Sequence, residues 1–209
     1  MTIMAQKGIL VVVSGFSGVG KGTLMRRLTE KYDDYALSIS ATTRQPREGE
    51  KDGREYFFHT KEEFEKMISE DALVEYACYC GNYYGTPSAY VEEQRNAGRD
   101  VILEIEIQGA LKIREKFPDA LLLFVMPPSA KVLKERLIGR GTESSEIIEA
   151  RLKRAAAEAE GVENYDYMLV NDDLEVCVEE MHSLISCQRN RVNRNLDFIQ
   201  QVREEVKAF

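Results

Sequence analysis

The stretch that decides the fold reads GILVVVSGFSGVGKGT, from Gly8 to Thr23. Its first half, Ile9–Val13, is short, continuous and rich in β-branched residues, which is typical of a strand buried on both faces of a parallel sheet. From Thr23 to Tyr32 the apolar side chains recur at helical spacing. A buried strand, a glycine-rich turn and an amphipathic helix in this order indicate an α/β fold.

The turn itself has the spacing G-x-x-x-x-G-K of a phosphate-binding loop, or P-loop. Its glycines let successive backbone N–H groups curl around phosphate oxygens, to which the following helix presents its positive end. Ser or Thr usually follows the lysine and contacts Mg²⁺, but here Gly22 takes that place and Thr23 comes next. The residues predicted to bind the triphosphate are Gly15, Ser17, Gly18, Val19, Gly20, Lys21, Gly22 and Thr23.

The rest of the chain alternates between strand and helix patterns. Further strands are expected at Val101–Glu106, Leu121–Met126 and Tyr167–Val170, and this alternation predicts a parallel α/β sheet. Residues 35–60 and 73–86 break the pattern with short, aromatic and glycine-rich segments. Helices are expected at about 61–70, 88–97 (capped by Ser88), 110–116, 129–138 and 144–160, and a long, mostly helical segment closes the chain.

Size and composition restrict the classes of protein. A chain of 209 residues suits one domain with a full core. The net charge of −8 argues against nucleic-acid binding, which needs clustered Lys and Arg. No apolar run reaches the length of a membrane span, no targeting signal is evident, and the four cysteines lack zinc-site spacing, so we expect a cytoplasmic protein that does not bind a membrane.

Two arginines point to the group that receives a phosphate. Arg44 and Arg47 flank Pro46, which stiffens the turn, and two guanidinium groups can clamp a monophosphate bidentately. A lone R-x-x-R pair is more simply interpreted as two surface arginines. The phosphate-binding interpretation therefore depends on the neighbouring motifs.

Those motifs resemble the guanylate kinase family nearly from end to end. They are the P-loop, T-T-R-x-P-R-x-G-E (42–50), Y-F-F (56–58), G-N-Y-Y-G-T (81–86), I-Q-G-A (107–110), F-V-x-P-P-S (124–129), R-L-x-G-R-G (136–141) and V-N-D-D (170–173). The resemblance implies Mg²⁺-dependent phosphoryl transfer from ATP to GMP, in purine nucleotide metabolism and GMP recycling. It also implies one domain: a three-layer P-loop α/β core with a parallel sheet (1–39, 89–133 and 164–209), a small mixed α/β GMP-binding excursion (40–88) and a helical lid (134–163).

The resemblance also assigns the acceptor site. Arg44, Arg47, Tyr56 and Tyr84 match positions that hold the 5′-phosphate of GMP, whereas Ser40, Glu75 and Thr86 match positions facing the base, and Glu106 is a further GMP contact. The chemistry of Glu75 agrees, because a carboxylate accepts from both guanine N1–H and the N2 amine but repels the lone pair on adenine N1.

The remaining assignments concern the donor side and the lid. Lys21, Arg44, Arg136, Arg140 and Arg151 are expected to be catalytic, because phosphoryl transfer needs positive charge around the transferring oxygens. Asn171 matches the place where the ATP base packs. Glu104, at the end of a predicted strand, and Thr23 are candidate Mg²⁺ contacts, directly or through water. Alternatively, Glu104 and Glu106 are acids with a structural role.

Three other functions were weighed. Non-catalytic interaction modules of this family lose the P-loop lysine and the lid arginines, which are present here. Gly-Lys-Gly-Thr is similar to adenylate kinases, but Glu75 and the Tyr-Tyr motif argue against them. A GTPase switch would need N-K-x-D, which the chain lacks. The sequence leaves open the use of dGMP as an acceptor and the existence of a homo-oligomer.

Overall fold

The protein is built on a five-stranded parallel sheet. A computed structural model describes residues 7–79, 81–139, 151–153, 155 and 159–209. Every neighbouring pair of strands is parallel, in the order β2 (Tyr35–Leu37), β7 (Asp100–Glu104), β1 (Leu10–Gly15), β8 (Leu121–Met126) and β9 (Tyr167–Val170). Because parallel strands end at the same edge, the loops that follow β1, β7 and β9 lie at one end of the sheet, where α/β proteins bind ligands.

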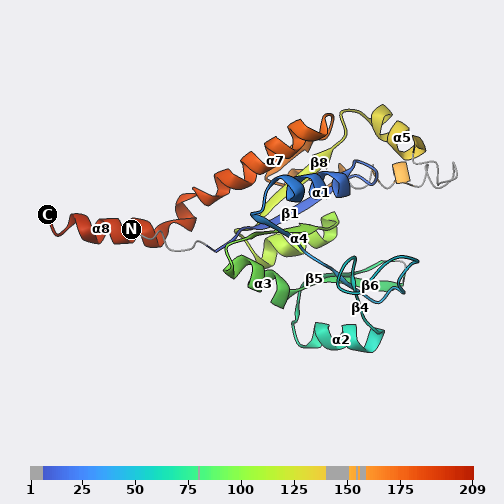
Figure 1. Ribbon diagram of the computed structural model, residues 1–209, viewed down its shortest axis with the longest axis horizontal. Helices are drawn as coiled ribbons and strands as arrows, with labels where there is room; N and C mark the ends of the chain where they lie inside the picture. Colours follow the sequence, from blue (N-terminus) through green and yellow to red (C-terminus); the bar gives the residue numbers. More distant parts are fainter. Residues whose placement is uncertain (1–6, 80, 140–150, 154, 156–158) are drawn as a thin grey trace.

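Helices cover both faces of this sheet (Figure 1). One face carries α1 (Lys21–Lys31), α5 (Ala130–Gly139) and α7 (Leu174–Arg189), and the other carries α3 (Ser88–Asn96) and α4 (Ile107–Lys116). Alternate residues of β1 supply the two cores: Val11 and Val13 belong to the first, and Leu10 and Val12 to the second. The predicted three-layer α/β core is thus confirmed.

A second, smaller sheet lies beside the core. Its order is β4 (Phe57–Phe58), β3 (Ala41–Thr42), β6 (Asn82–Pro87) and β5 (Leu73–Tyr79), with one parallel and two antiparallel pairings. The helix α2 (Lys61–Ser69) begins with a capping box between Thr60 and Glu63 and buries Phe64 against Ala41 and Leu73. We call residues 40–88 the excursion; it has the mixed α/β character expected from the sequence.

Some predicted boundaries are wrong by a few residues. Helix α1 begins at Lys21 rather than Thr23, directly after Gly20. Pro87, not Ser88, is the N-cap of α3, because the backbone N–H of Ser88 bonds to Ala72 O. Strand β7 ends at Glu104, so Glu106 is not part of the strand; it is the N-cap of α4, which begins three residues earlier than expected.

The C-terminal segment is interrupted rather than continuous. The side chain of Asn195 donates to the carbonyl of Arg189, the last residue of α7, and to that of Arg191, in competition with the helical pattern. A short 3₁₀ turn, Val192–Arg194, separates α7 from the last helix, α8 (Leu196–Val206). Another 3₁₀ turn, Val162–Asn164, lies before β9. Helix α8 extends away from the core (Figure 1) and buries none of its residues. In the described part of the chain, no helix has both the length and the apolarity that crossing a membrane requires.

Candidate functional site

The P-loop connects β1 to α1, and its lysine donates hydrogen bonds to carbonyls at the start of the loop. Lys21 Nζ donates to the carbonyl of Gly15 at 2.7 Å and to that of Phe16 at 3.4 Å. Gly18 and Gly20 have φ values of 89° and 98°, which side chains other than glycine rarely adopt. A Cβ on Gly18 would also lie 2.5 Å from Leu137 Cδ2. Glycine is therefore required here by both backbone conformation and packing.

The departure from the usual P-loop pattern has no packing cause. A Cβ on Gly22 would meet no atom within 4 Å, so there is space for a serine or threonine at this position. Gly22 and Thr23 are exposed in the first turn of α1. Thr23, two residues after Lys21, is accordingly accessible.

Two residues from other elements donate hydrogen bonds to a backbone carbonyl of the P-loop, that of Val19. Asn171, in the loop after β9, is 6% exposed and donates from Nδ2 to Val19 O at 2.9 Å. Arg136, on α5, donates from Nη1 to Asn171 O at 2.8 Å and to Val19 O at 3.3 Å. A Cβ on Gly20 would lie 2.9 Å from Asn171 Nδ2. Helix α5, the loop after β9 and the P-loop are therefore joined by hydrogen bonds.

The structure describes one of the other two arginines that the sequence assigned to a lid. Arg151 donates from Nη1 to Ser17 Oγ at 3.1 Å, which brings its guanidinium to the rim of the P-loop. Arg140 lies outside the described residues, as does most of the predicted helix at 144–160. Arg136 and Arg151 thus both approach the P-loop, from different segments of the chain.

Glu104 lies between the P-loop and the excursion. The Glu104 residue is exposed, yet desolvation by surrounding protein atoms raises the pKa of its carboxyl, an effect that the charge of Lys21 opposes. Glu104 also contributes to raising the pKa of Tyr56, after the larger effect of burial. Glu106 is exposed at the start of α4. Within the described ranges, no three His, Cys, Asp or Glu side chains cluster as ligands for a metal ion.

Glu75 is a buried carboxylate on β5. It is 8% exposed, and burial raises its pKa, whereas the hydrogen bond from Thr86 and the charge of Lys112 lower it. Thr86 Oγ1 donates to Glu75 Oε1 at 2.9 Å. The second oxygen lies close to α4, since a Cβ on Gly109 would be 3.0 Å from Glu75 Oε2. The carboxylate has therefore been taken out of water with one hydrogen bond from the protein, leaving capacity to accept more.

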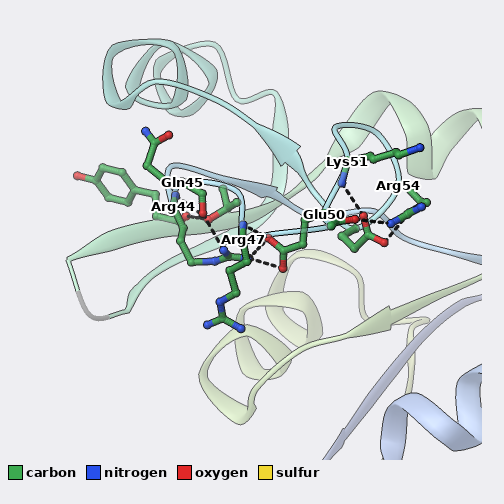
Figure 2. Close-up of polar contacts among 10 residues, drawn as sticks. Arg44, Gln45, Arg47, Glu50, Lys51 and Arg54 are labelled. Atoms are coloured by element: carbon green, nitrogen blue, oxygen red, sulfur yellow. Dashed lines mark hydrogen bonds and ion pairs between the residues drawn. The ribbon is translucent and has the colours of Figure 1, made fainter.

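Arg44 is oriented by an acid from its own loop (Figure 2). Its Nη2 lies 2.9 Å from both carboxylate oxygens of Glu50, and its Nη1 donates to Gln45 O at 2.7 Å. The backbone N–H of Arg47 donates to Glu50 Oε2, and this bond, with a smaller effect of Arg44, lowers the pKa of Glu50. The Arg47 guanidinium extends away from Glu50. Glu50 thus holds Arg44 in place and closes the turn, while Arg47 is exposed.

Aromatic rings frame the same guanidinium. The Arg44 guanidinium carbon lies 5.3 Å from the centroid of the Tyr56 ring and 5.9 Å from that of Phe58. The rings of Tyr56 and Tyr84 meet edge to face at 6.0 Å. Ser40 is half-buried directly before β3. The structure therefore brings the side chains of Arg44, Tyr56 and Tyr84 together.

Comparison with known proteins identifies the family. The family model described as guanylate kinase matches residues 7–188. The chain belongs to the guanylate kinase family. It is 50% identical over 200 residues to the guanylate kinase of Caldanaerobacter subterraneus, covering 96% of this chain and 97% of that protein. It is 45% identical over 205 residues to that of Lactococcus lactis, covering 98% and 100%. The crystal structure of guanylate kinase from Anaplasma phagocytophilum matches with a TM-score of 0.72 and 33% identity over 90% of each chain.

Reasoning from the sequence missed three residues of this guanylate kinase family site. Glu50 ends the T-T-R-x-P-R-x-G-E motif, but its spacing alone does not reveal that it faces Arg44. Gly109 permits α4 to approach Glu75. The charge of Lys112, one turn further along α4, lowers the pKa of Glu75. The sequence signal for Gly109 is its place in the I-Q-G-A motif, and the signal for Lys112 is that it follows three residues later.

Proposed function

We propose that this protein transfers the γ-phosphoryl group of ATP to GMP. The bond from the γ-phosphorus to the bridging oxygen of ADP breaks, and a bond from that phosphorus to a 5′-phosphate oxygen of GMP forms. Proteins contribute to such transfers mainly by positioning and by stabilising charge. Membership of the guanylate kinase family supports this activity, and the chemistry of Glu75 supports the choice of acceptor. We also propose the cytoplasm as its compartment.

The observation that carries the proposal is the buried Glu75 carboxylate. An ionised carboxylate in this setting needs hydrogen-bond donors, and guanine offers two adjacent ones, N1–H and the N2 amine. We propose that Ser40, Thr86 and Glu106 complete the base contacts, and that Arg44, Arg47, Tyr56 and Tyr84 hold the 5′-phosphate. We further propose that residues 40–88 act as the acceptor region and residues 134–163 as the lid of a single domain.

The donor side would be formed by the P-loop together with Mg²⁺. Mg²⁺ prefers oxygen ligands and keeps several waters, so a site built from phosphate oxygens with few protein ligands suits it. Thr23 and Glu104 are both exposed and offer oxygen ligands, and Glu104 is close enough to Lys21 to be affected by its charge, which fits this requirement. Arg136, Arg140 and Arg151 would add positive charge around the phosphoryl group. The Mg²⁺ ion would neutralise charge on the transferring phosphates.

The test is coupled ADP release from purified protein with ATP and Mg²⁺, with GMP, dGMP, AMP, CMP and UMP offered in turn. We expect GMP to support turnover and AMP, CMP and UMP to fail. Arg44→Ala should abolish most of this activity, whereas Arg54→Ala, an exposed arginine of the same loop, should retain it. Equal turnover with AMP would contradict the assignment of Glu75. Binding of GMP without any turnover would favour a non-catalytic interaction module.

Glu50 provides a further prediction about the acceptor side. Glu50→Gln removes the charge that orients Arg44, and we expect KM for GMP to rise by roughly tenfold with KM for ATP unchanged. Steady-state kinetics with each substrate varied in turn measures this. Glu48→Gln, an exposed glutamate in the same loop, is the matched control. Equal increases in both KM values would show that Glu50 supports the fold in general rather than the GMP phosphate site.

A further inference from the structure

The carbonyl oxygen of Val19 is the point where three separate segments meet. It accepts a hydrogen bond from Asn171 Nδ2 at 2.9 Å, across 152 residues of sequence, and another from Arg136 Nη1 at 3.3 Å. Val19 is fully buried, and Asn171 is 6% exposed. Asn171 is itself fixed, since its backbone N–H donates to Met126 O and its carbonyl accepts from Arg136.

This arrangement determines where the next backbone N–H of the loop points. A trans peptide bond places its C=O and N–H on opposite sides, so the donors that hold Val19 O also fix the N–H of Gly20 in the direction away from Asn171 and Arg136. Gly20 has a φ of 98°, and residues in this region form the concave nests of N–H groups that bind anions. The side chain of Asn171 therefore contacts the loop at the peptide whose N–H belongs to Gly20, on the side of its carbonyl.

We propose that Asn171 is a positioning residue of the P-loop, and that it acts on the phosphates of the donor nucleotide through Val19 rather than through contact with the base. Arg136 braces the same arrangement by donating to Asn171 O. The carboxamide nitrogen of Asn171 faces the loop, and it lies so close to Gly20 that a Cβ at that position would be only 2.9 Å from it. This inference rests on the proposed use of ATP as the phosphoryl donor.

The two roles predict different ligand dependences. If Asn171 positions the P-loop, its loss weakens the binding of any triphosphate, with or without a base. If it packs on the base, its loss weakens ATP binding and leaves a bare triphosphate unaffected. Inorganic tripolyphosphate is therefore a suitable probe, because it carries three linked phosphates and no base.

The experiment is isothermal titration calorimetry of the full chain with ATP, tripolyphosphate and GMP, with Mg²⁺ omitted throughout. The variants are Asn171→Ala, which removes the donor, and Asn171→Asp, which directs a carboxylate at Val19 O. Asn96→Ala, an exposed asparagine at the end of α3, is the control. We expect Kd for ATP and for tripolyphosphate to rise by the same factor, about tenfold for Ala and at least as much for Asp, with Kd for GMP unchanged.

Three results would overturn the inference. Unchanged tripolyphosphate binding with weaker ATP binding would assign Asn171 to the base. Equal weakening of GMP binding would show a general loss of structure. If the original protein binds neither ATP nor tripolyphosphate, the proposed donor site fails, and the inference fails with it; binding of both by the original protein separates the two cases.

Discussion

Replacing Lys21 by methionine should reduce kcat by about 10³-fold while leaving the fold intact. The lysine donates to the carbonyls of Gly15 and Phe16, and with ATP bound its charge would lie against the β- and γ-phosphates. Removing one preorganised charged donor from a phosphoryl-transfer site costs rates of this order. Methionine keeps most of the aliphatic chain, so packing changes little. Coupled ADP release with GMP measures the effect.

Lys134→Met is the matched control for this experiment, because Lys134 is an exposed lysine on α5. It loses the same charge outside the P-loop, and we expect its kcat to stay within about twofold of the original, as is usual for exposed sites. Thermal unfolding should show that Lys21→Met remains folded. A loss of less than about tenfold for Lys21→Met would contradict the assigned role of the lysine.

Glu75→Gln is expected to weaken GMP use and to stabilise the fold. A glutamine turns an NH₂ group towards the donors of guanine, so one hydrogen bond is lost and the other is no longer charge-assisted. We expect kcat/KM for GMP to fall by roughly 100-fold, with KM for ATP little changed. Thr86 can still donate to the amide oxygen, so the local structure is retained.

The pH dependence follows from the raised pKa of Glu75, whose main cause is burial. Because the folded-state pKa lies above the unfolded one, the contribution of this group to stability is present below the unfolded pKa and is lost as pH rises through the folded pKa. At neutral pH, Glu75→Gln should therefore raise the melting temperature. GMP binding needs the carboxylate, so the affinity of the original protein should fall with decreasing pH earlier than an ordinary glutamate would allow.

The control for Glu75 is Glu93→Gln, an exposed acid on α3, which should change neither the melting temperature nor the kinetics appreciably. Calorimetric GMP titrations at several pH values, for the original protein and Glu75→Gln, separate this group from other titrations. Identical pH profiles would contradict the role of Glu75. A lower melting temperature for Glu75→Gln would contradict the stated cost of burying its charge.

Much of the fold was predictable because its signals are local. The buried strand at Ile9–Val13, the glycine turn and the helix after it follow from the spacing of residues within a few turns of one another. Boundaries were less predictable, since they depend on single capping contacts. The N–H of Ser88, for example, bonds to the carbonyl of Ala72, which no pattern around position 88 reveals.

The chemistry of the site divides in the same way. The sequence indicated Arg44 and Arg47 as a phosphate clamp, and the family resemblance added Tyr56 and Tyr84; that Arg44 lies over the Tyr56 ring, and Tyr56 against Tyr84, comes from the structure. The resemblance also indicated Asn171, but as a base contact. The direction of that side chain, towards Val19 O, depends on how β9 lies beside β8 and how the loop after it returns to the P-loop.

The sequence by itself determined the residue types of the phosphate loop, the alternation of strands and helices, and the identity of the acids and arginines of the candidate site. Only the tertiary structure decided that β7 lies between β2 and β1, that Glu50 faces Arg44, and that α4 approaches Glu75 at Gly109. The physical reason is range: periodicity and glycine spacing act between near neighbours, whereas a side chain's partner and its burial depend on segments brought together by packing of the whole chain.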